Sequence, residues 1–362
     1  MESKRVLIIH HNDRDGYMSA AVLYHYLKNK DCYNDIYTRK IDYSTGLWEV
    51  YKKCISSYGN MDEIYIVDYS VSNIVNAQTM LKINKECRKL VWIDHHVSSI
   101  KRMEEYPELR TIEGFRLIGM AGVGLTYLYT MRDSLKYEYE KELLDIIYQF
   151  SNTYTELLKS DALKILTSLD CPKICVLTHR YDIFDIDEDV LRFNYGCPVE
   201  SVSDAFGYLY LKSKTDENLL KNIIHDGEVI KGYLDKWNKV LVEENAQEVV
   251  LTMGDYGDPY NSSEEKKFGL ALNHTTFNSL VFGDTIKKYD FVMIYAKEKD
   301  LWKHSLYTVS DDFDCSKVAE FFGGGGHKKA AGFCLDAPFF VSTNMIKIIK
   351  KSIKKENKDE NL

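Results

Sequence analysis

The sequence predicts an α/β fold in which a mainly parallel sheet flanked by helices is followed by a helical connector and a smaller C-terminal α/β domain. Short apolar runs alternate with helical patterns over residues 5–100, which is typical of parallel sheets. A long amphipathic stretch, residues 217–248, then has no evident core of its own. The 362 residues are enough for two separate hydrophobic cores.

The elements follow in order from apolar periodicity and from the residues that begin or end helices. The strands expected in the first half are Val6–Ile9, Asp35–Ile41, Ile64–Val67 and Leu90–Ile93. The helices expected between and after them are Tyr17–Asn29, Leu47–Ser57 and Ser72–Asn84, with Ser72 as the N-cap of the last. From residue 114 to about 206 the pattern is mostly helical, with a start rich in small residues at 119–124 and candidate helices at 143–158 and 162–169.

The second half predicts a different arrangement of elements. Strand-like runs lie at residues 248–253, 268–272, 291–295 and 305–309, and a helix over Cys315–Phe322 precedes four glycines. The long stretch at 217–248 contains Gly227 and Gly232, which we expect to interrupt it. We therefore expect a first domain over 1–210, a connector over 211–250, a second domain over 251–350 and a polar tail over 351–362.

Composition narrows the classes of function. The fractions of hydrophobic (45%) and charged (28%) residues are those of a globular protein, and the net charge of −8 argues against a generally basic surface that coats DNA. The eight cysteines are scattered, and the pair Cys171 and Cys175 lacks a second pair that could complete a zinc site. No apolar run is long enough for a bilayer. We expect reduced thiols, no membrane partner and a cytoplasmic location.

The segment from His11 to Gly16, HNDRDG, follows the first apolar run. In an extended chain alternate side chains share a face, so we expect His11, Asp13 and Asp15 to point the same way and His10 to point the opposite way. Gly16 would permit a sharp turn, after which the N-terminus of a helix faces the same place. The segment predicts a place where metal ions meet a phosphate.

Two more strands end in similar residues. Asp68 follows the third strand, and Asp94, His95 and His96 follow the fourth. Ligands of open α/β sheets bind at the carboxyl ends of strands, so these groups can converge with the first segment. An aspartate after a strand is often only a helix cap, but that reading weakens when all of them lie at one edge. Oxygen-rich ligands with some imidazole favour Mn²⁺ or Mg²⁺, and in a two-ion site Asp68 is the natural bridging ligand.

The four glycines at 323–326 are more than the end of a helix requires. Such a run lets backbone N–H groups approach an anion closely, and His327, Lys328 and Lys329 add donors and positive charge. A flexible turn is the usual alternative for glycine-rich segments. The adjoining histidine and the Ala-Ala-Gly that follows favour an anion site here.

Together these motifs resemble a known family. The segments HxDxDG at 11–16, the lone Asp68 and the Asp-His-His at 94–96 resemble the first three motifs of the DHH phosphoesterases. The pair Ser305-Leu306, the segment from Val318 to Phe322 and GGGGHxxAAGF at 323–333 resemble the DHHA1-type C-terminal domain of that family. Their order and spacing also agree, and the resemblance covers most of the chain.

The resemblance implies two Mn²⁺ ions, with Mg²⁺ as the alternative metal. One ion would be held by His11, Asp13 and Asp68, and the other by Asp15, Asp68, His95 and a fourth-motif aspartate. The segment RYDIF at 180–184 is similar to that motif, which makes Asp182 the choice and Asp185 its rival. The resemblance further implies that Asp94 orients a histidine and that His96 contacts the scissile phosphate and assists the leaving oxygen.

The function implied is that of a Mn²⁺-dependent phosphodiesterase that hydrolyses very short single-stranded oligonucleotides, like the nanoRNase branch of the family, by attack of a hydroxide shared by two ions. Residues Gly323, Gly324, Gly325, Gly326, His327 and Tyr307 would bind the substrate. Tyr307 stands where members acting on oligonucleotides often have an arginine, so other small nucleotides stay open as substrates. The alternatives are a phosphatase of 3′,5′-bisphosphorylated nucleotides, a phosphodiesterase of cyclic or linear dinucleotides, and a nucleotide-binding protein with a decayed site. A homodimer is also left open.

Overall fold

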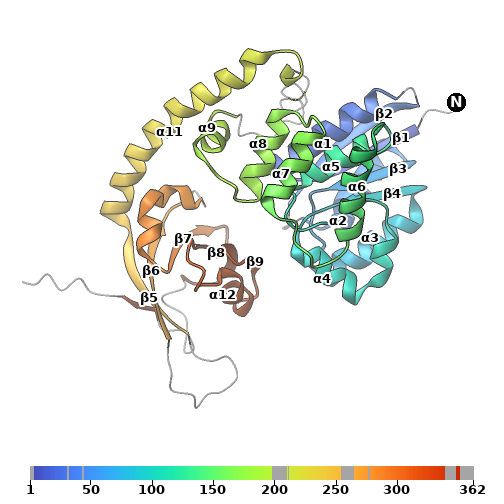
Figure 1. The fold of residues 1–362 in the computed structure, drawn as a ribbon. Coiled ribbons are helices and arrows are strands. Elements are labelled where there is room, and N and C mark those ends of the chain that lie inside the picture. Colours follow the sequence, from blue (N-terminus) through green and yellow to red (C-terminus); the bar gives the residue numbers. More distant parts are fainter. Residues whose placement is uncertain are drawn as a thin grey trace, which may run out of the picture. The chain divides into compact units, whose positions relative to one another are not determined.

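The computed structural model describes residues 4–30, 32–42, 45–197, 210, 212–253, 265–275, 278–338 and 348–350. The chain divides into two compact units, Met1–Lys231 and Gly232–Leu362 (Figure 1). The expected polar tail, residues 351–362, lies outside the described residues. Within the described part of the chain, no helix is both long and apolar enough to cross a membrane.

The first unit contains a parallel sheet of four strands, which confirms the predicted α/β class. Its strands are β1 (Lys4–His11), β2 (Tyr33–Ile41), β3 (Glu63–Val67) and β4 (Lys89–Ile93), in the order β2-β1-β3-β4. The connecting helices are α1 (Arg14–Lys28), α2 (Leu47–Tyr58) and α3 (Ile74–Glu86), and α4 (Val97–Glu105) and the 3₁₀ helix η1 (Pro107–Thr111) follow β4. The predicted N-cap of α3 was wrong, because Asn73 and not Ser72 accepts the N–H of Asn76.

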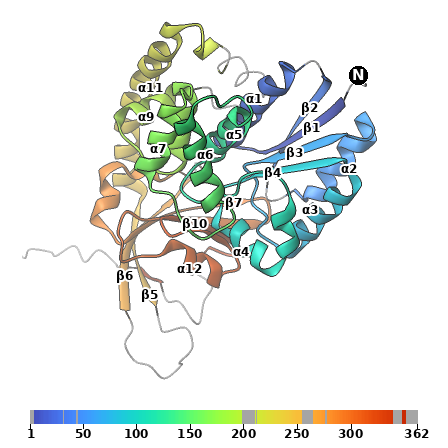
Figure 2. The same cartoon turned by 45° about the vertical axis from the view of Figure 1, so that its right-hand side comes forward.

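Both faces of this sheet are buried. Val6 and Ile8 of β1 belong to a core formed with α1 and the later helix α5 (Gly122–Met131), whereas Leu7 and Ile9 belong to a core formed with α2 and α3. Figure 2 shows these two pairs of helices on opposite sides of the sheet. Burial on both faces explains why the strands read as continuous apolar runs and not as alternating ones.

After η1, most of the described residues of the first unit are helical, as expected. It contains α5, α6 (Glu138–Phe150), α7 (Lys159–Ser168), α8 (Lys173–Asp182) and α9 (Glu188–Gly196). The expected helix over 143–158 was too long, since α6 ends at Phe150 and Asn152 turns back with a φ of 64° to donate its N–H to the carbonyl of Arg116.

The long helix α11 (Glu217–Asn245) runs through both glycines that we expected to interrupt it. Packing requires a glycine at position 227, because a Cβ there would lie 1.7 Å from the carbonyl oxygen of Arg192 in α9. Nothing lies within 4 Å of the corresponding position at Gly232. The close contact of α9 with α11 therefore accounts for the first glycine but not for the second.

The second unit contains a mixed sheet of seven strands in the order β11-β5-β6-β7-β8-β10-β9. The strands are β5 (Gln247–Met253), β6 (Glu265–Asn273), β7 (Phe291–Glu298), β8 (Leu301–Tyr307), β9 (Gly325–His327), β10 (Ala330–Leu335) and β11 (Ile348–Lys350). Strands β6 and β7 are parallel and all other neighbours are antiparallel. The helix α12 (Cys315–Phe321) contributes to one core and the 3₁₀ helix η2 (Ser279–Lys288) to another, so this unit is also α/β.

Candidate metal centre

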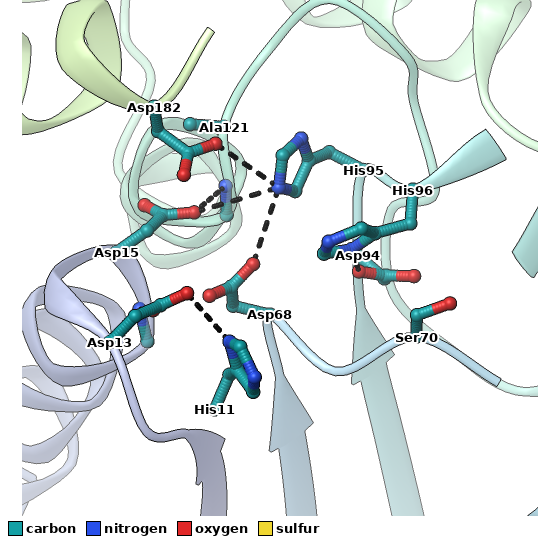
Figure 3. A network of polar contacts seen from close by, with 12 residues as sticks. His11, Asp13, Asp15, Asp68, Ser70, Asp94, His95, His96, Ala121 and Asp182 are labelled. Atoms are coloured by element: carbon teal, nitrogen blue, oxygen red, sulfur yellow. Dashed lines mark hydrogen bonds and ion pairs between the residues drawn. The ribbon is translucent and has the colours of Figure 1, made fainter. Parts of the chain in front are cut away.

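Carboxylates and imidazoles lie together at the carboxyl ends of β1, β3 and β4, as the sequence predicts (Figure 3). His11 is the last residue of β1, Asp68 directly follows β3, and His95 is the second residue after β4. The Nε2 atom of His95 lies 3.3 Å from Asp68 Oδ1, 3.3 Å from Asp182 Oδ2 and 3.8 Å from Asp15 Oδ2. Residues far apart in the sequence thus form one cluster.

The expectation that His11, Asp13 and Asp15 share one face of an extended strand was wrong. β1 ends at His11 and α1 begins at Arg14, so Asp13 is the N-cap of α1 and Asp15 lies in its first turn. Asp13 accepts the N–H of Gly16 at 2.8 Å, and its other oxygen lies 2.6 Å from Nδ1 of His11. A strand that passes directly into a helix brings these groups together.

Gly16 is needed for close approach and not for a turn. It lies inside α1, and a Cβ at this position would be 2.3 Å from the carbonyl oxygen of His11. The rival ligand His10 is buried and donates from Nδ1 to that same carbonyl oxygen at 2.8 Å. Burial lowers the pKa of His10 to about 4, so it is a neutral packing residue.

The N-terminus of α5 holds Asp15, a contact that sequence reasoning missed. The two oxygens of this carboxylate accept the N–H groups of Gly122 at 2.6 Å and Val123 at 2.8 Å. The preceding N–H, that of Ala121, donates to Nδ1 of His179 at 3.1 Å. A Cβ at Gly122 would lie 2.9 Å from Asp15 Oδ2 and 2.7 Å from the Cβ of Asp68. The small residues at 119–124 were the signal of this close approach.

Asp68 occupies the centre of the cluster in an unusual state. Its φ of 54° is left-handed, and it is almost fully buried. Neither of its carboxylate oxygens accepts a hydrogen bond from the described residues. Burial raises the pKa of Asp68 well above its ordinary value, and the charges of Asp15 and Asp13 raise it further. A buried carboxylate without donors is costly unless a cation binds it.

Asp15 and Asp182 are carboxylates of the same cluster whose pKa values are also raised. Burial, followed by the charges of Asp182 and Asp13, raises the pKa of Asp15 well above its ordinary value. Burial and the charge of Asp13 raise the pKa of Asp182 to about 7, and its Oδ2 accepts no hydrogen bond from the described residues. Asp13 differs, because the hydrogen bond and charge of His11 outweigh its burial and hold its pKa below the ordinary value.

Of the two fourth-motif candidates, Asp182 lies at the cluster. It is the last residue of α8, with its carboxylate directed at His95 (Figure 3). Asp185 instead accepts the Nε–H of Arg180 at 2.7 Å. The arginine that stands at the first position of this motif therefore binds an aspartate of the following loop.

His96 pairs with Asp94 at the edge of the cluster. Its Nδ1 lies 2.7 Å from Oδ1 of the buried Asp94, whose other oxygen accepts the hydroxyl of Ser99. Burial lowers the pKa of His96, but the charge and hydrogen bond of Asp94 outweigh it and raise this pKa to about 9. The pKa of Asp94 falls below its ordinary value, since the charge of His96 outweighs its burial. At neutral pH the pair is a carboxylate and an imidazolium.

The donor set fits divalent cations. Three groups have ligand atoms within 4.8 Å of one another: His11, Asp13 and Asp68; Asp15, His95 and Asp182; and Asp68, His95 and His96. The carboxylate oxygens without donors and the raised pKa values are what cations would relieve. Carboxylates with one or two imidazoles suit Mn²⁺ or Mg²⁺ better than thiolate-preferring metals.

The glycine segment of the second unit is a turn followed by an edge strand and not an open loop. Gly323 has a φ of +75° just after α12, and Gly325 to His327 form β9, which pairs with β10. A Cβ at Gly324 would lie 2.1 Å from the carbonyl oxygen of Gly332, and one at Gly326 would lie 2.6 Å from that of Ala330. Only Gly325 of these four has neither a positive φ nor a close neighbour among the described residues. Tyr307, at the end of β8, pairs with Ala330.

Residues 5–149 match the model of the DHH family, N-terminal domain. Solved structures similar to the chain include RecJ in complex with Mn²⁺ from Thermus thermophilus (14% identity, 92% of this chain and 50% of that chain, TM-score 0.46). An exopolyphosphatase-related protein from Bacteroides fragilis has 14% identity over 93% of this chain and 88% of its own, with a TM-score of 0.43. The pGpG-specific phosphodiesterase PggH from Vibrio cholerae has 13% identity over 92% and 93%, with a TM-score of 0.33. A search of curated proteins found no match.

Proposed function

Since residues 5–149 belong to the DHH family of metal-dependent phosphoesterases, we propose that this protein is a Mn²⁺-dependent phosphodiesterase that hydrolyses very short oligonucleotides. The observation that carries the proposal is Asp68. This buried carboxylate accepts no hydrogen bond from the described residues and lies 3.3 Å from His95, at the centre of the carboxylate cluster. It is the ligand that two cations would share.

The ligand atoms divide into two sets around Asp68. His11, Asp13 and Asp68 would hold one cation, and Asp15, His95 and Asp182 would hold a second together with Asp68. Bound divalent cations would supply Lewis acidity, which makes a water nucleophilic near neutral pH and offsets the charge of the phosphate oxygens. The protein contributes the fixed positions of the ligands, because helix termini hold both Asp13 and Asp15 in place.

His96 would act on the leaving group. Asp94 keeps it protonated at neutral pH and fixes its ring through Nδ1, and Ser99 fixes the carboxylate in turn. An imidazolium in this position would contact the scissile phosphate and give a proton to the departing oxygen.

We propose that the second unit is a DHHA1-type domain that binds the phosphate end of the substrate through Gly323–Gly326, His327 and Tyr307. Lys329 has a different role, since its Nζ donates to Asp311 at 2.6 Å and to the carbonyl of Ser310 at 2.7 Å. Gly325 supports the proposal, because neither backbone conformation nor crowding requires a glycine there. All eight cysteines are thiols, which supports the proposed cytoplasmic location.

One assay tests the proposed function. The protein would be incubated with Mn²⁺ and 5′-phosphorylated di- to decanucleotides, adenosine 3′,5′-bisphosphate, linear and cyclic dinucleotides and pyrophosphate. We expect faster cleavage of dinucleotides than of decanucleotides and no turnover with the Asp68→Ala variant. Release of phosphate from the bisphosphate alone would overturn the proposal in favour of a nucleotide phosphatase. Binding of nucleotides without turnover, unchanged in Asp68→Ala, would indicate a binding protein.

A further inference from the structure

The segment that follows Asp182 ends α8 in a Schellman motif. The N–H of Phe184 donates to the carbonyl of Tyr181 at 3.2 Å, and that of Asp185 donates to the carbonyl of Arg180 at 2.8 Å. These are the two hydrogen bonds that define the motif. In it, the residue at the position of Phe184 adopts a left-handed conformation, and its φ here is 56°.

A phenylalanine is unexpected at this position, which glycine usually occupies because a Cβ destabilises the left-handed conformation. Four other described non-glycine residues have a positive φ: Asp68, Asn152, Asp170 and Lys299. Three of these are Asp or Asn, the residue types that tolerate this conformation best. Phe184 is therefore the one aromatic residue with a positive φ among the described residues.

Packing does not compensate for this strain. The side chain of Phe184 is 52% exposed, and its ring belongs to none of the hydrophobic cores of the described residues. Ile186, two residues further along the chain, is also exposed. A bulky residue kept in a strained conformation without burial points to a role in binding.

The loop that carries Phe184 is held in place. Lys159, the first residue of α7, donates from Nζ to the carbonyl oxygen of Phe184 at 3.0 Å. Arg180 donates to Asp185 at 2.7 Å and to Asp187 at 2.9 Å. The ring thus projects from a backbone that is fixed on both sides of it.

Phe184 also lies next to the metal centre along the chain. It follows Asp182 by two residues, so its Cα is within about 7.6 Å of the Cα of that ligand, given the fixed spacing of consecutive Cα atoms. A nucleotide whose phosphate is at the cations has a base within reach of such a position. An exposed aromatic ring is the side chain on which bases of any sequence stack.

We propose that Phe184 binds a base of the substrate by stacking and so makes the enzyme select nucleotides over other phosphate esters. This inference rests on the proposed function, because it assumes that a nucleotide phosphate occupies the metal centre. It also explains why the chain has a phenylalanine where glycine would be more stable. The ring is a specificity residue and takes no part in the chemical step.

The test compares three substitutions at this position. Phe184→Ala removes the ring and keeps the Cβ, Phe184→Gly removes the ring and relieves the left-handed strain, and Phe184→Trp keeps an aromatic ring. Each would be assayed with Mn²⁺ on a 5′-phosphorylated adenine dinucleotide and on two analogues in which one base is replaced by an abasic tetrahydrofuran. Tyr139→Ala, which removes an aromatic ring that is 49% exposed on α6, is the matched control. Melting temperatures would be measured for all variants.

We expect the Ala and Gly variants to raise KM for the dinucleotide on the order of 5- to 150-fold, the range that alanine substitution gives for a stacked base, with little change in kcat. On the analogue that lacks the stacked base, the wild type and both variants should be equal. Phe184→Gly should melt above Phe184→Ala, which separates lost stacking from lost stability, and Phe184→Trp should retain the low KM. An unchanged KM in Phe184→Gly, or an equal loss on both abasic analogues, would overturn the inference.

Failure of the proposed function has a different signature. If the wild type cleaves no dinucleotide but releases phosphate from adenosine 3′,5′-bisphosphate, the proposed substrate is wrong. The role of Phe184 is then tested on that compound against ribose 3,5-bisphosphate, which has no base. A KM that rises in Phe184→Gly only for the adenosine compound supports stacking, and equal effects on both exclude it. If no nucleotide is a substrate, both proposals fail.

Discussion

The carboxylate of Asp15 accepts the backbone N–H of Gly122 at 2.6 Å, a contact between residues that are 107 positions apart in the chain. The N-terminus of α5 thereby offers a hydrogen bond and a positive dipole end to a buried carboxylate. The same glycine leaves room for two candidate metal ligands, because a Cβ would crowd both Asp15 and Asp68. One residue of α5 therefore affects two ligands of the cluster at once.

The substitution Gly122→Ala tests this relationship. We expect Mn²⁺ affinity to fall about 10- to 100-fold, as it does when residues that orient metal ligands are changed. The unfolding free energy of the metal-free protein should fall by about 1–3 kcal/mol, because the added methyl group overpacks a buried site. Calorimetric titration with Mn²⁺ and chemical denaturation measure the two effects.

The matched control is Gly232→Ala in α11, where nothing lies within 4 Å of the added Cβ. This substitution should leave Mn²⁺ binding unchanged and stabilise the protein by about 0.5–1 kcal/mol, the cost of a glycine inside a helix. Equal Mn²⁺ affinities for Gly122→Ala and the wild type would show that the positions of Asp15 and Asp68 do not depend on the space that Gly122 leaves.

The cluster also predicts the pH dependence of stability. The pKa of Asp182 is raised to about 7 by burial, and those of Asp15 and Asp68 are raised well above their ordinary values. These carboxyls bind more protons in the native state than in the unfolded state, so they lower the unfolding free energy of the metal-free protein as the pH rises from about 4 to beyond 7. The buried His10, His179 and His304, whose pKa values burial lowers to about 4, oppose this below about pH 6.5, so we expect the net decrease above about pH 6.5. Each carboxyl contributes at most about 1.4 kcal/mol per pH unit. Denaturation in EDTA at pH 5, 6, 7 and 8 measures the slope.

Two comparisons make this slope diagnostic. Asp182→Asn removes one of the buried charges and should reduce the decrease, whereas Asp185→Asn, at the residue that pairs with Arg180, should not. Mn²⁺ at about 100 times its dissociation constant should add about 2.7 kcal/mol near pH 7.5. A stability in EDTA that rises from pH 7 to pH 8 is the outcome that contradicts charge repulsion in the cluster.

Much of this site could be predicted from the sequence, because the strands and the residues at their ends can be recognised from local sequence patterns. Each apolar run before His11, Asp68 and His95 marks a strand, and the carboxyl ends of parallel strands share an edge. The reasoning that grouped His11 with Asp15 was wrong, although the two residues do meet at one site. The helix begins at Arg14, only three residues after the strand ends, so a helix cap and not a strand face arranges them.

The remaining features depend on contacts that no local pattern contains. The two hydrogen bonds from the N-terminus of α5 to Asp15 require α5 to pack against α1. In the sequence, only the small residues near Gly122 indicate such a close approach. The choice between Asp182 and Asp185 depends on the Schellman motif that ends α8 and on the pairing of Asp185 with Arg180. Within the glycine segment, the need for Gly324 follows from a hairpin with β10 that brings it against Gly332.

Substitutions of Arg180 test how the C-terminal end of α8 is held in position. It binds Asp185 and Asp187 and so stabilises the motif in which Asp182 is the last helical residue. We expect Arg180→Ala to weaken Mn²⁺ binding on the order of 10-fold, because Asp182 loses its fixed position. Arg180→Lys should recover only part of this, since a lysine cannot make the same forked contacts.

Arg192→Ala is the control for the loss of a positive charge. Among the described residues, Arg192 pairs with Glu188, Asp189 and Glu228 at 3.5–3.9 Å. Such long ion pairs contribute little, and none involves a candidate ligand, so the removal of Arg192 should leave Mn²⁺ affinity unchanged. Electron paramagnetic resonance of bound Mn²⁺ measures affinity in each variant. If the two arginine variants behave alike, the effect is one of net charge and not of the position of Asp182.

Asp94 and His96 give the last prediction. In the wild type, burial lowers the pKa of His96 but Asp94 raises it to about 9, so the imidazolium persists through neutral pH. Asp94→Asn removes the charge that raises the pKa of His96 most and leaves the burial and the charges of Asp182 and Asp13, so this pKa should fall towards its ordinary value of 6.5. The rate of an enzyme that needs a protonated His96 should decrease above about pH 9 in the wild type and already above about pH 6.5 in the variant.

The measurement is kcat from about pH 6 to pH 10 at saturating Mn²⁺ and dinucleotide. Near pH 8 the Asp94→Asn variant should lose on the order of 30-fold in kcat, because a group with a pKa near 6.5 is then almost entirely deprotonated. Mn²⁺ affinity should stay within a few-fold, because neither Asp94 nor His96 belongs to the two proposed ligand sets around Asp68. Ser99→Ala, which removes only the hydroxyl on the second oxygen of Asp94, keeps the charge of Asp94, so its basic limb should stay near pH 9. A basic limb that stays near pH 9 in Asp94→Asn would mean that another group donates the proton, because the charge that keeps His96 protonated there would be gone.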